Sequence, residues 1–242
     1  MEPGVYSAGS SLVANLRAQE VTAHNLANIN TPGFRRRLAL FHPFQAQLAA
    51  AQPSGTQVDE VVIDFAPGPV QQTGNPLDVA LEGEGFFVLR GPSGYLYSRK
   101  GNFALGADGT VVDSVGRPLL AEGGGELKIP NETREIRVDS RGQVFADKTS
   151  VGRIWVADVP KPRAFVPAAY TAFTLPAGAP PATTVENPTV VQGALEGSNT
   201  NAVDEVVSMI VTLRSFEAAQ RVLHAIDESL KQTTSAASAP NS

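Results

Sequence analysis

The chain has 242 residues and a net charge of −5, an acidic balance that argues against a general nucleic-acid binder, because such proteins present a basic face. Its hydrophobic content of 42% is ordinary for a globular protein and allows a sizeable core in one large domain or two smaller ones. The sequence has no cysteine, which excludes disulfides, thiolate catalysis and cysteine-ligated metal.

Residues 3–28 are predicted to form a helix. Pro3 suits a first helical position. Pro32 and Gly33 end the pattern, because proline restricts the residue before it and glycine permits a turn. Within the helix, apolar and small residues recur at alternating steps of four and three, which is the spacing of a heptad seam. The predicted seam consists of Val5, Gly9, Leu12, Leu16, Gln19, Ala23 and Leu26.

The N-terminal helical segment is assigned to residues 1–33. Residues 34–57 are predicted to be a linker that follows it. Three adjacent arginines, Arg35 to Arg37, could bind an anionic surface, but a solvated charge cluster is the more ordinary arrangement and is the one expected. Residues 42–57 are rich in Ala, Gln, Pro and Ser, a composition typical of a loosely held segment.

Residues 58–194 are predicted to form one central, mostly antiparallel β domain. Short runs of β-branched and aromatic residues are bounded there by glycine or proline. In the run 77–81, Leu77, Val79 and Leu81 alternate with other residues and therefore share one face of a sheet. A further strand is expected at 154–159.

Turn-forming residues locate a hairpin and two breaks in the β region. The stretch 91–94, Gly-Pro-Ser-Gly, predicts a hairpin between residues 86–89 and 95–97. Proline-rich stretches at 160–167 and 176–188 are expected to be irregular or edge segments, because proline cannot donate to a β ladder.

Residues 195–242 are predicted to contain a second, longer helix. Asn201 can cap it with its side-chain oxygen, and Asp204 and Glu205 place negative charge at the positive end of the helix dipole. The uninterrupted run 202–232 would reach roughly 45 Å at about 1.5 Å per residue. Apolar residues recur mostly at steps of three or four, at Val203, Val206, Ile210, Leu213, Phe216, Ala219, Leu223, Ile226 and Leu230.

Two helices with narrow apolar stripes at the two ends of the chain indicate that the ends pair. The expected fold class is α+β, with the N- and C-terminal helices paired as a coiled-coil-like layer and a central, mostly antiparallel β domain. Helices with such narrow stripes are marginal until they pack laterally against neighbours. Neither helix has the unbroken apolar span of a membrane segment, so direct membrane insertion is not expected.

The sequence shows no catalytic constellation, so the protein is expected not to be an enzyme and to use no cofactor or metal. Glu82 and Glu84 could suggest acid–base chemistry, but exposed carboxylates at a tight bend explain this glycine-flanked pair better. His24 and His224, on the two helices, have no metal-ligand spacing. No serine stands in a Gly-x-Ser-x-Gly elbow.

Three separated stretches resemble the flagellar hook–basal body axial proteins. Residues 22–34, Thr-Ala-His-Asn-Leu-Ala-Asn-Ile-Asn-Thr-Pro-Gly-Phe, resemble the N-terminal signature of that family. Residues 74–87 with 97–103 resemble its central motif. Residues 195–199 with 209–210, 214–217 and Asp227 resemble its C-terminal signature. The resemblance spans nearly the whole chain in the family's order. It implies a bacterial flagellar rod or hook subunit that polymerises helically around a central channel.

Within the family, the details favour the proximal rod, with a distal-rod or hook-type subunit second. The segment 42–57 is brief beside the long insertion associated with distal-rod and hook proteins. Arg214-Ser-Phe-Glu217 and the ending Thr31-Pro-Gly-Phe-Arg35 also lean towards the proximal type. A surface adhesin or phage-tail-like protein could share terminal helices around a β body but would lack the three motifs together.

The resemblance also implies a place, partners and contact residues. It implies the periplasmic rod of the basal body, contacts with further copies or neighbouring rod proteins, and export by the flagellar type III apparatus. Export without a cleaved signal peptide is expected, because the N-terminus is acidic and lacks an apolar core segment. Asn25, Asn28, Asn30 and Asn199 are candidates for bonding backbone groups where helices meet the β domain. The residues expected at subunit contacts are Val5, Leu12, Leu16, Leu26, Asn28, Val206, Ile210, Leu213, Phe216, Leu223, Ile226 and Leu230.

Overall fold

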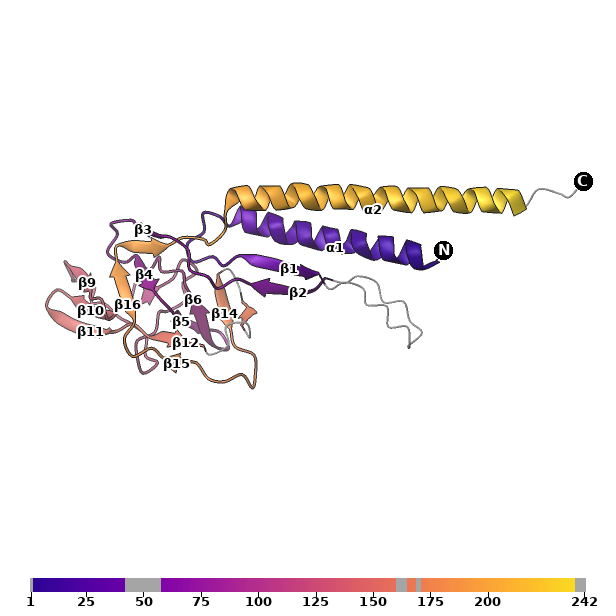
Figure 1. The fold of residues 1–242 in the computed structure, drawn as a ribbon. Helices are drawn as coiled ribbons and strands as arrows, with labels where there is room; N and C mark the ends of the chain where they lie inside the picture. Colours follow the sequence, from indigo (N-terminus) through magenta and orange to yellow (C-terminus); the bar gives the residue numbers. More distant parts are fainter. Residues whose placement is uncertain (1, 42–57, 160–164, 169–170, 238–242) are drawn as a thin grey trace, which may run out of the picture. The chain divides into compact units, whose positions relative to one another are not determined.

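The computed structural model describes residues 2–41, 58–159, 165–168 and 171–237 (Figure 1). The chain divides into two compact units. A helical unit takes its described residues from 1–27, 37–64 and 201–242, and a β unit takes them from 28–36 and 65–200. Two terminal helices and a mostly antiparallel β region confirm the predicted α+β class.

The helical unit consists of two helices and a β hairpin. α1 (Glu2–Ala27) and α2 (Ala202–Ala237) pack side by side, and β1 (Arg37–Phe41) pairs antiparallel with β2 (Val58–Ile63) and packs on α1 (Figure 1). The division into domains therefore differs from the prediction in two places. β1 lies inside the expected linker, whose residues 42–57 are outside the described residues, and β2 belongs to the helical unit.

The cap of α2 forms as predicted. The Asn201 side-chain Oδ1 accepts a hydrogen bond from the Val203 N–H at 2.9 Å, and the Asn201 carbonyl accepts the first intrahelical bond from the Glu205 N–H at 3.1 Å. An i,i+4 ion pair joins Lys231 Nζ to Asp227 Oδ2 on α2 at 2.7 Å. Both residues are exposed, so this pair contributes little to stability.

The seams that are covered inside the helical unit differ from the predicted ones. On α1, a heptad series of buried or half-buried residues lies one position before the predicted seam, at Ala8, Ser11, Asn15, Ala18, Thr22 and Asn25. On α2, the covered series is Ala202, Glu205, Met209, Thr212, Phe216, Ala219, Leu223 and Ile226. It matches the predicted stripe from Phe216 onward and lies one residue before it in the first half.

Side-chain size explains the shift. The prediction followed the large apolar residues, whereas the covered seam of α1 is built from small and polar side chains that allow close approach of a neighbouring element. Small residues at a helix interface bring the backbones together, and large ones hold them apart. Several large apolar residues beside these seams, such as Val13 and Leu16, therefore remain at the surface of the helical unit, although Val21 is buried.

The β unit is built from short antiparallel strands. A six-stranded sheet has the order β13-β14-β6-β5-β12-β15, a three-stranded sheet the order β11-β10-β9, and three two-stranded ladders pair β16 with β4, β17 with β3, and β7 with β8. The strands are β3 Val70–Gln72, β4 Val79–Glu82, β5 Phe86–Gly91, β6 Gly94–Ser98, β7 Ala104–Leu105, β8 Val111–Val112, β9 Ile136–Val138, β10 Gln143–Ala146, β11 Thr149–Arg153, β12 Val156–Asp158, β13 Val166–Pro167, β14 Ala172–Thr174, β15 Thr183–Thr184, β16 Thr189–Gln192 and β17 Ala194–Glu196.

Several β predictions are confirmed. The hairpin at 91–94 joins β5 to β6, with Arg90 opposite Tyr95. The proline-rich stretches supply the two edge strands of the six-stranded sheet, β13 and β15, where a missing N–H does not interrupt a central ladder. Residues 160–164 of the first stretch lie outside the described residues. In β4 both Val79 and Ala80 are buried, so this strand is covered on both faces rather than one.

One turn geometry recurs four times in the β unit. In each, the first residue of a five-residue loop donates its N–H to the fifth carbonyl, and the fourth residue, a glycine, donates to the first. The four glycines have positive φ angles of 78 to 89°, as in a hairpin loop that ends in a bulge. The loops are 106–110, 113–117, 121–125 and 139–143.

The core of the β unit lies among these strands and turns. It consists of Val79, Leu81, Phe87, Leu89, Phe103, Val111, Leu119, Leu127, Ile129, Val144, Ala146, Ile154, Val156 and Val190. A second cluster of rings, Phe65, Phe86, Phe165 and Phe173, packs with centroids 5.0 to 6.3 Å apart. The β unit therefore carries the larger hydrophobic core, whereas the helical unit is held chiefly along its seams.

Candidate subunit interface

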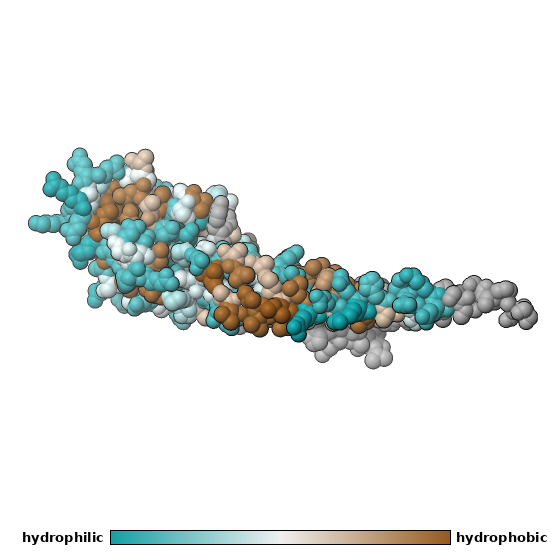
Figure 2. All heavy atoms as spheres, turned by 90° about the horizontal axis from the view of Figure 1, so that it is seen from above, coloured by the Kyte–Doolittle hydropathy of each residue, from teal (hydrophilic) through white to brown (hydrophobic). Residues whose placement is uncertain are grey.

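The first half of α2 carries an apolar surface that the helical unit leaves exposed. Figure 2 shows hydrophobic residues gathered where α2 begins and hydrophilic ones towards its far end. The exposed fraction of each of these apolar residues lies between 39 and 68%. We call this the α2 face, and it consists of Val203, Val206, Val207, Ile210, Val211 and Leu213.

The α2 face and the covered seam run beside each other on one helix. The seam includes Glu205, Met209 and Thr212, and the α2 face occupies positions one and two residues after them. Exposed apolar surface of this kind, concentrated on one element, is typical of a protein interaction site. Burying one valine or isoleucine side chain contributes about 1.5–3 kcal/mol, so six such residues provide a strong driving force for association.

α1 also exposes large apolar residues. Val13 is 67% exposed and Leu16 is 47% exposed. They adjoin a surface ion pair in which Arg17 Nη1 lies 2.8 Å from Glu20 Oε2. This second apolar strip is smaller than the α2 face and chemically different from it, because charged groups flank it.

The predicted contact residues whose side chains are described lie in two environments. Leu16, Val206, Ile210 and Leu213 are exposed. Leu12, Leu26, Asn28, Phe216, Leu223 and Ile226 are half-buried, so the single chain already covers part of each. The side chains of Val5 and Leu230 lie outside the described residues.

A buried polar contact ties the elements of the helical unit together. The Asn25 side chain accepts a hydrogen bond from the Arg37 N–H at 2.9 Å and donates to the Arg37 carbonyl at 2.8 Å and to Glu205 Oε2 at 3.3 Å. Asn25 and Glu205 are each 1% exposed. One asparagine of α1 therefore bonds backbone groups of β1 and the first turn of α2, inside the helical unit rather than where the helices meet the β domain as predicted.

His24 lies next to this contact in the last turn of α1. Burial lowers the pKa of the His24 imidazole below its ordinary value, and the positive charge of Arg37 lowers it further. Both effects disfavour the protonated ring. The charge state of His24 is therefore coupled to the packing of the helical unit.

Within the β unit, a buried ion cluster corrects the prediction for the arginine run. Arg35 is not solvated: its Nη2 lies 2.7 Å from Glu196 Oε1, and each side chain is 1% exposed. Arg99 Nη1 binds the other carboxylate oxygen of Glu196 at 3.2 Å. Burial lowers the pKa of Arg99, and the Glu196 carboxylate acts in the opposite direction. Sequence reasoning missed Glu196 and Arg99, because no local pattern marks partners so distant in the chain.

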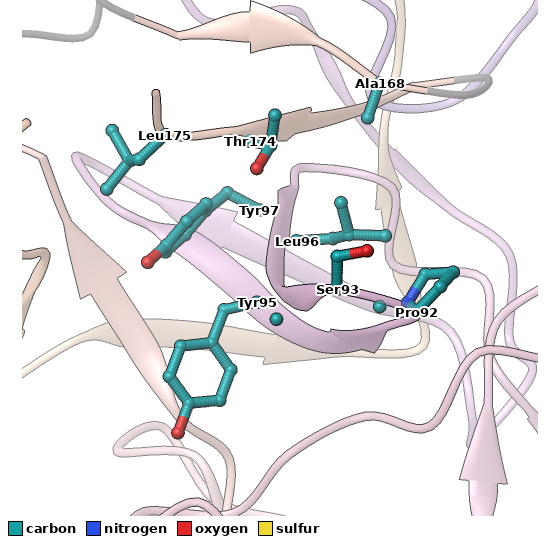
Figure 3. A pocket seen from close by; sticks show the side chains of 10 residues that line it. Pro92, Ser93, Tyr95, Leu96, Tyr97, Ala168, Thr174 and Leu175 are labelled. Atoms are coloured by element: carbon teal, nitrogen blue, oxygen red, sulfur yellow. The ribbon is translucent and has the colours of Figure 1, made fainter. Parts of the chain in front are cut away.

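The β unit has a surface hollow beside the β5–β6 turn. A shallow hollow of about 400 Å³ between the β5–β6 turn and the end of β14 is lined by Pro92, Ser93, Tyr95 and Thr174, among others (Figure 3). Glu82 and Glu84 are exposed at the bend that Gly83 makes with a φ of 93°, as predicted. No group of three potential metal-ligating residues occurs among the described residues.

The two described helices differ from membrane-spanning segments in composition. None of them, over residues 2–27 or 202–237, is both long and apolar enough to cross a bilayer. This agrees with the alternating polar and apolar composition of both helices.

Three family models match the chain in order. Residues 5–35 match the model described as flagella basal body rod protein, residues 80–146 the flagellar hook protein FlgE/F/G D1 domain, and residues 191–236 the flagellar basal body rod FlgEFG protein C-terminal. The first and last matches include most of α1 and α2, and the middle one lies within the β unit.

Whole-chain comparisons give similar proteins of two kinds. The flagellar basal-body rod protein FlgG of Agrobacterium fabrum is 32% identical over 86% of this chain and 89% of its own. The flagellar basal-body rod proteins FlgF of Salmonella typhimurium and Escherichia coli are 31% and 29% identical, each over 94% of this chain and 95% of its own. The similarity therefore covers both units.

Proposed function

This chain belongs to the flagellar basal-body rod protein family and is a structural subunit of the rod, and we propose that it polymerises helically through its terminal helices to form the drive shaft and the export channel inside it. The α2 face is the observation that carries this mechanism. A single chain covers one seam of α2 and leaves a second, more apolar stripe exposed. We propose that neighbouring subunits cover that stripe.

The two helices present unlike surfaces, which suits an open assembly. The α2 face is broad and aliphatic, whereas Val13 and Leu16 of α1 lie beside the pair of Arg17 and Glu20. Contacts between two different patches of identical subunits are heterologous, and when the rotation does not close they generate a helical filament. The proposed contact set is the α2 face together with Val13 and Leu16 of α1. Of the contact residues expected from the sequence, it keeps Leu16, Val206, Ile210 and Leu213.

The place along the rod is part of the proposal. We assign the chain to the proximal rod, next to neighbouring rod proteins, on the sequence Arg214-Ser-Phe-Glu217 and the short segment 42–57. The similar proteins named FlgF and those named FlgG match to comparable degrees, so the distal rod is the alternative. Purified basal bodies cross-linked and digested would identify the axial protein bonded to α2; cross-links only to hook proteins would contradict the assignment.

Export is proposed to proceed through the flagellar type III apparatus without cleavage, which would deliver the chain to the periplasmic rod. Membership of the rod protein family, with matches at residues 5–35 and 191–236, supports this proposal. Mass spectrometry of the protein in assembled basal bodies should find the N-terminus intact apart from Met1. A mature chain that begins well inside α1 would contradict the proposal.

The interface is tested by placing a charge on the α2 face. Val207 is 54% exposed, so Val207→Asp should leave the soluble chain folded but bury an unpaired carboxylate wherever subunits pack, at a cost of several kcal/mol. Cells carrying only this variant should lack completed rods and motility. Gln220→Asp adds the same charge at an exposed polar position of α2 and is the matched control. Normal rods with Val207→Asp would remove the α2 face from the interface.

A further inference from the structure

Three connecting segments join the β unit to the helical unit: 28–36 follows α1, 65–69 follows β2, and 197–200 precedes α2. Glu196, the last residue of β17 and directly before the third connector, binds the other two connectors. Its carboxylate Oε1 accepts from the Gly68 N–H at 3.0 Å as well as from Arg35, and its backbone carbonyl accepts from the Gly33 N–H at 2.7 Å.

A second set of hydrogen bonds links the three connectors to one another. The Ala66 carbonyl accepts from Arg35 Nη1 at 2.9 Å and from Asn199 Nδ2 at 3.0 Å. Asn199 Oδ1 accepts from the Arg36 N–H at 2.7 Å. Each connector is therefore bonded to both of the others, entirely within the β unit.

Arg99 fixes this set of bonds to the sheet. Its guanidinium binds Glu196 and also donates to the carbonyls of Leu81 and Gly83, at the end of β4. The connectors are thereby anchored to a strand whose residues belong to the main core of the β unit. We call Arg35, Arg99, Glu196 and Asn199 the connector clamp.

Stability alone is a poor explanation for the connector clamp. Two guanidinium groups share one carboxylate, and the three side chains are 1 to 5% exposed. The Nε atoms of Arg35 and Arg99 have no hydrogen-bond partner among the described residues. Buried ion clusters of this kind contribute little net stability compared with apolar packing. Their bonds are directional, however, and directional bonds fix geometry.

We propose that the connector clamp is a positioning device that makes the pairing of α1 with α2 depend on the folded β unit. The helical unit buries mainly small side chains, such as Ala14 and Ala18, so its helix pair is marginal by itself. The two helices come from opposite ends of the chain, and bringing them together carries a loop-closure cost. Fixed connectors remove that cost and raise the effective concentration of one helix near the other.

The test uses the full-length soluble chain, so it does not depend on polymerisation. Hydrogen exchange is measured in Glu196→Gln for α1, α2, the connectors and the core strands β4 and β5. Loss of the carboxylate leaves two buried guanidinium groups without their charge partner, and exchange in both helices should rise by roughly tenfold or more. Exchange at β4 and β5 should rise by a smaller factor.

Asp113→Asn is the matched control. Asp113 is buried and pairs with the half-buried Arg117 of the β unit, whose Nη2 lies 2.6 Å away, and its hydrogen bonds go to residues 115–117 rather than to a connector. This variant should accelerate exchange in the β unit and leave the ratio of helix exchange to core exchange at its native value. An equal rise in helix exchange in Asp113→Asn and Glu196→Gln would overturn the proposal.

Asn199→Ala leaves every charge in place and is the second test of the connector clamp, to be used if Glu196→Gln does not fold. It removes the bonds to the Arg36 N–H and the Ala66 carbonyl. We expect faster exchange in both helices with a native melting temperature for the β unit. Faster exchange at residues 66–68 with native helix exchange would show that the connector clamp does not position the helices.

Discussion

At the scale of single residues, Gly116 is required by backbone conformation rather than by lack of space. Its φ is 89°, and a Cβ there would meet nothing within 4 Å. Gly116→Ala should therefore destabilise the β unit by about 1–2 kcal/mol, the cost of a left-handed conformation for a residue with a Cβ. Gly125→Ala, equally open but without a positive φ, should change stability by less than about 1 kcal/mol. Thermal unfolding distinguishes the two; equal losses would contradict the argument.

His24 makes the helical unit sensitive to acid. Its folded-state pKa is lowered by burial and by Arg37, so the unfolded chain binds more protons as the pH falls through the ordinary histidine value of about 6.5. Helix stability should therefore be complete above that pH and decrease below it. Circular-dichroism melts between pH 7.5 and 5 should show this loss, and His24→Gln should reduce it.

The exposed His224 on α2 provides the control for that experiment. His224→Gln makes the same substitution on the outside of the helical unit. This variant should lose helix stability at low pH to the same extent as the parent chain. If His24→Gln lost as much helix stability at low pH as the parent chain does, carboxylates rather than His24 would set the acid sensitivity of the helices.

At the scale of elements, Asn25 joins α1, β1 and α2. Asn25→Ala leaves the Arg37 N–H and carbonyl without their side-chain partner, and each unsatisfied buried group costs about 1–3 kcal/mol. The helical unit should melt at lower temperature and β1 amides should exchange faster. Asn15→Ala, at a half-buried position of the same helix, should cost less. A native melting temperature in Asn25→Ala would show that the helical unit does not need the hydrogen bonds of the Asn25 side chain.

Local elements were predictable because their signals are local. Asn201 and the residues after it determine the cap of α2, and Gly-Pro-Ser-Gly at 91–94 determines the turn between β5 and β6. Proline placed the edge strands β13 and β15 for the same reason. Each of these features needs only the few residues around it.

Local sequence signals could not predict the covered seams of α1 and α2 or the connector clamp. A helix with two stripes gives no sign of which stripe the same chain covers, and the larger residues were chosen although small ones pack closer. Glu196 and Arg35 lie in different motifs, and only the fold brings them within 2.7 Å. The apolar stripes could therefore be placed on these two helices from the sequence, but not divided into covered and exposed faces.

At the scale of the whole molecule, the two stripes of α2 have different roles in the proposed assembly. Leu223 is half-buried on the covered seam, whereas Val207 is 54% exposed on the α2 face. The covered seam holds the helical unit together, and the proposed role of the α2 face is to hold subunits together. A charge at each position therefore separates folding of the helical unit from assembly.

Leu223→Asp should disrupt both the helix pair and the rod, because an unpaired carboxylate in an apolar seam costs several kcal/mol or must take up a proton. Hydrogen exchange should accelerate in α1 and α2 of the soluble variant, and cells carrying only this variant should lack rods. The β unit has its own core and should keep its melting temperature. Val207→Asp should lose rods with native helix exchange. Normal rods in Leu223→Asp would place this residue outside any packed seam. Unfolding of the β unit in the same variant would mean that α2 belongs to its core, and the division into two units would be wrong.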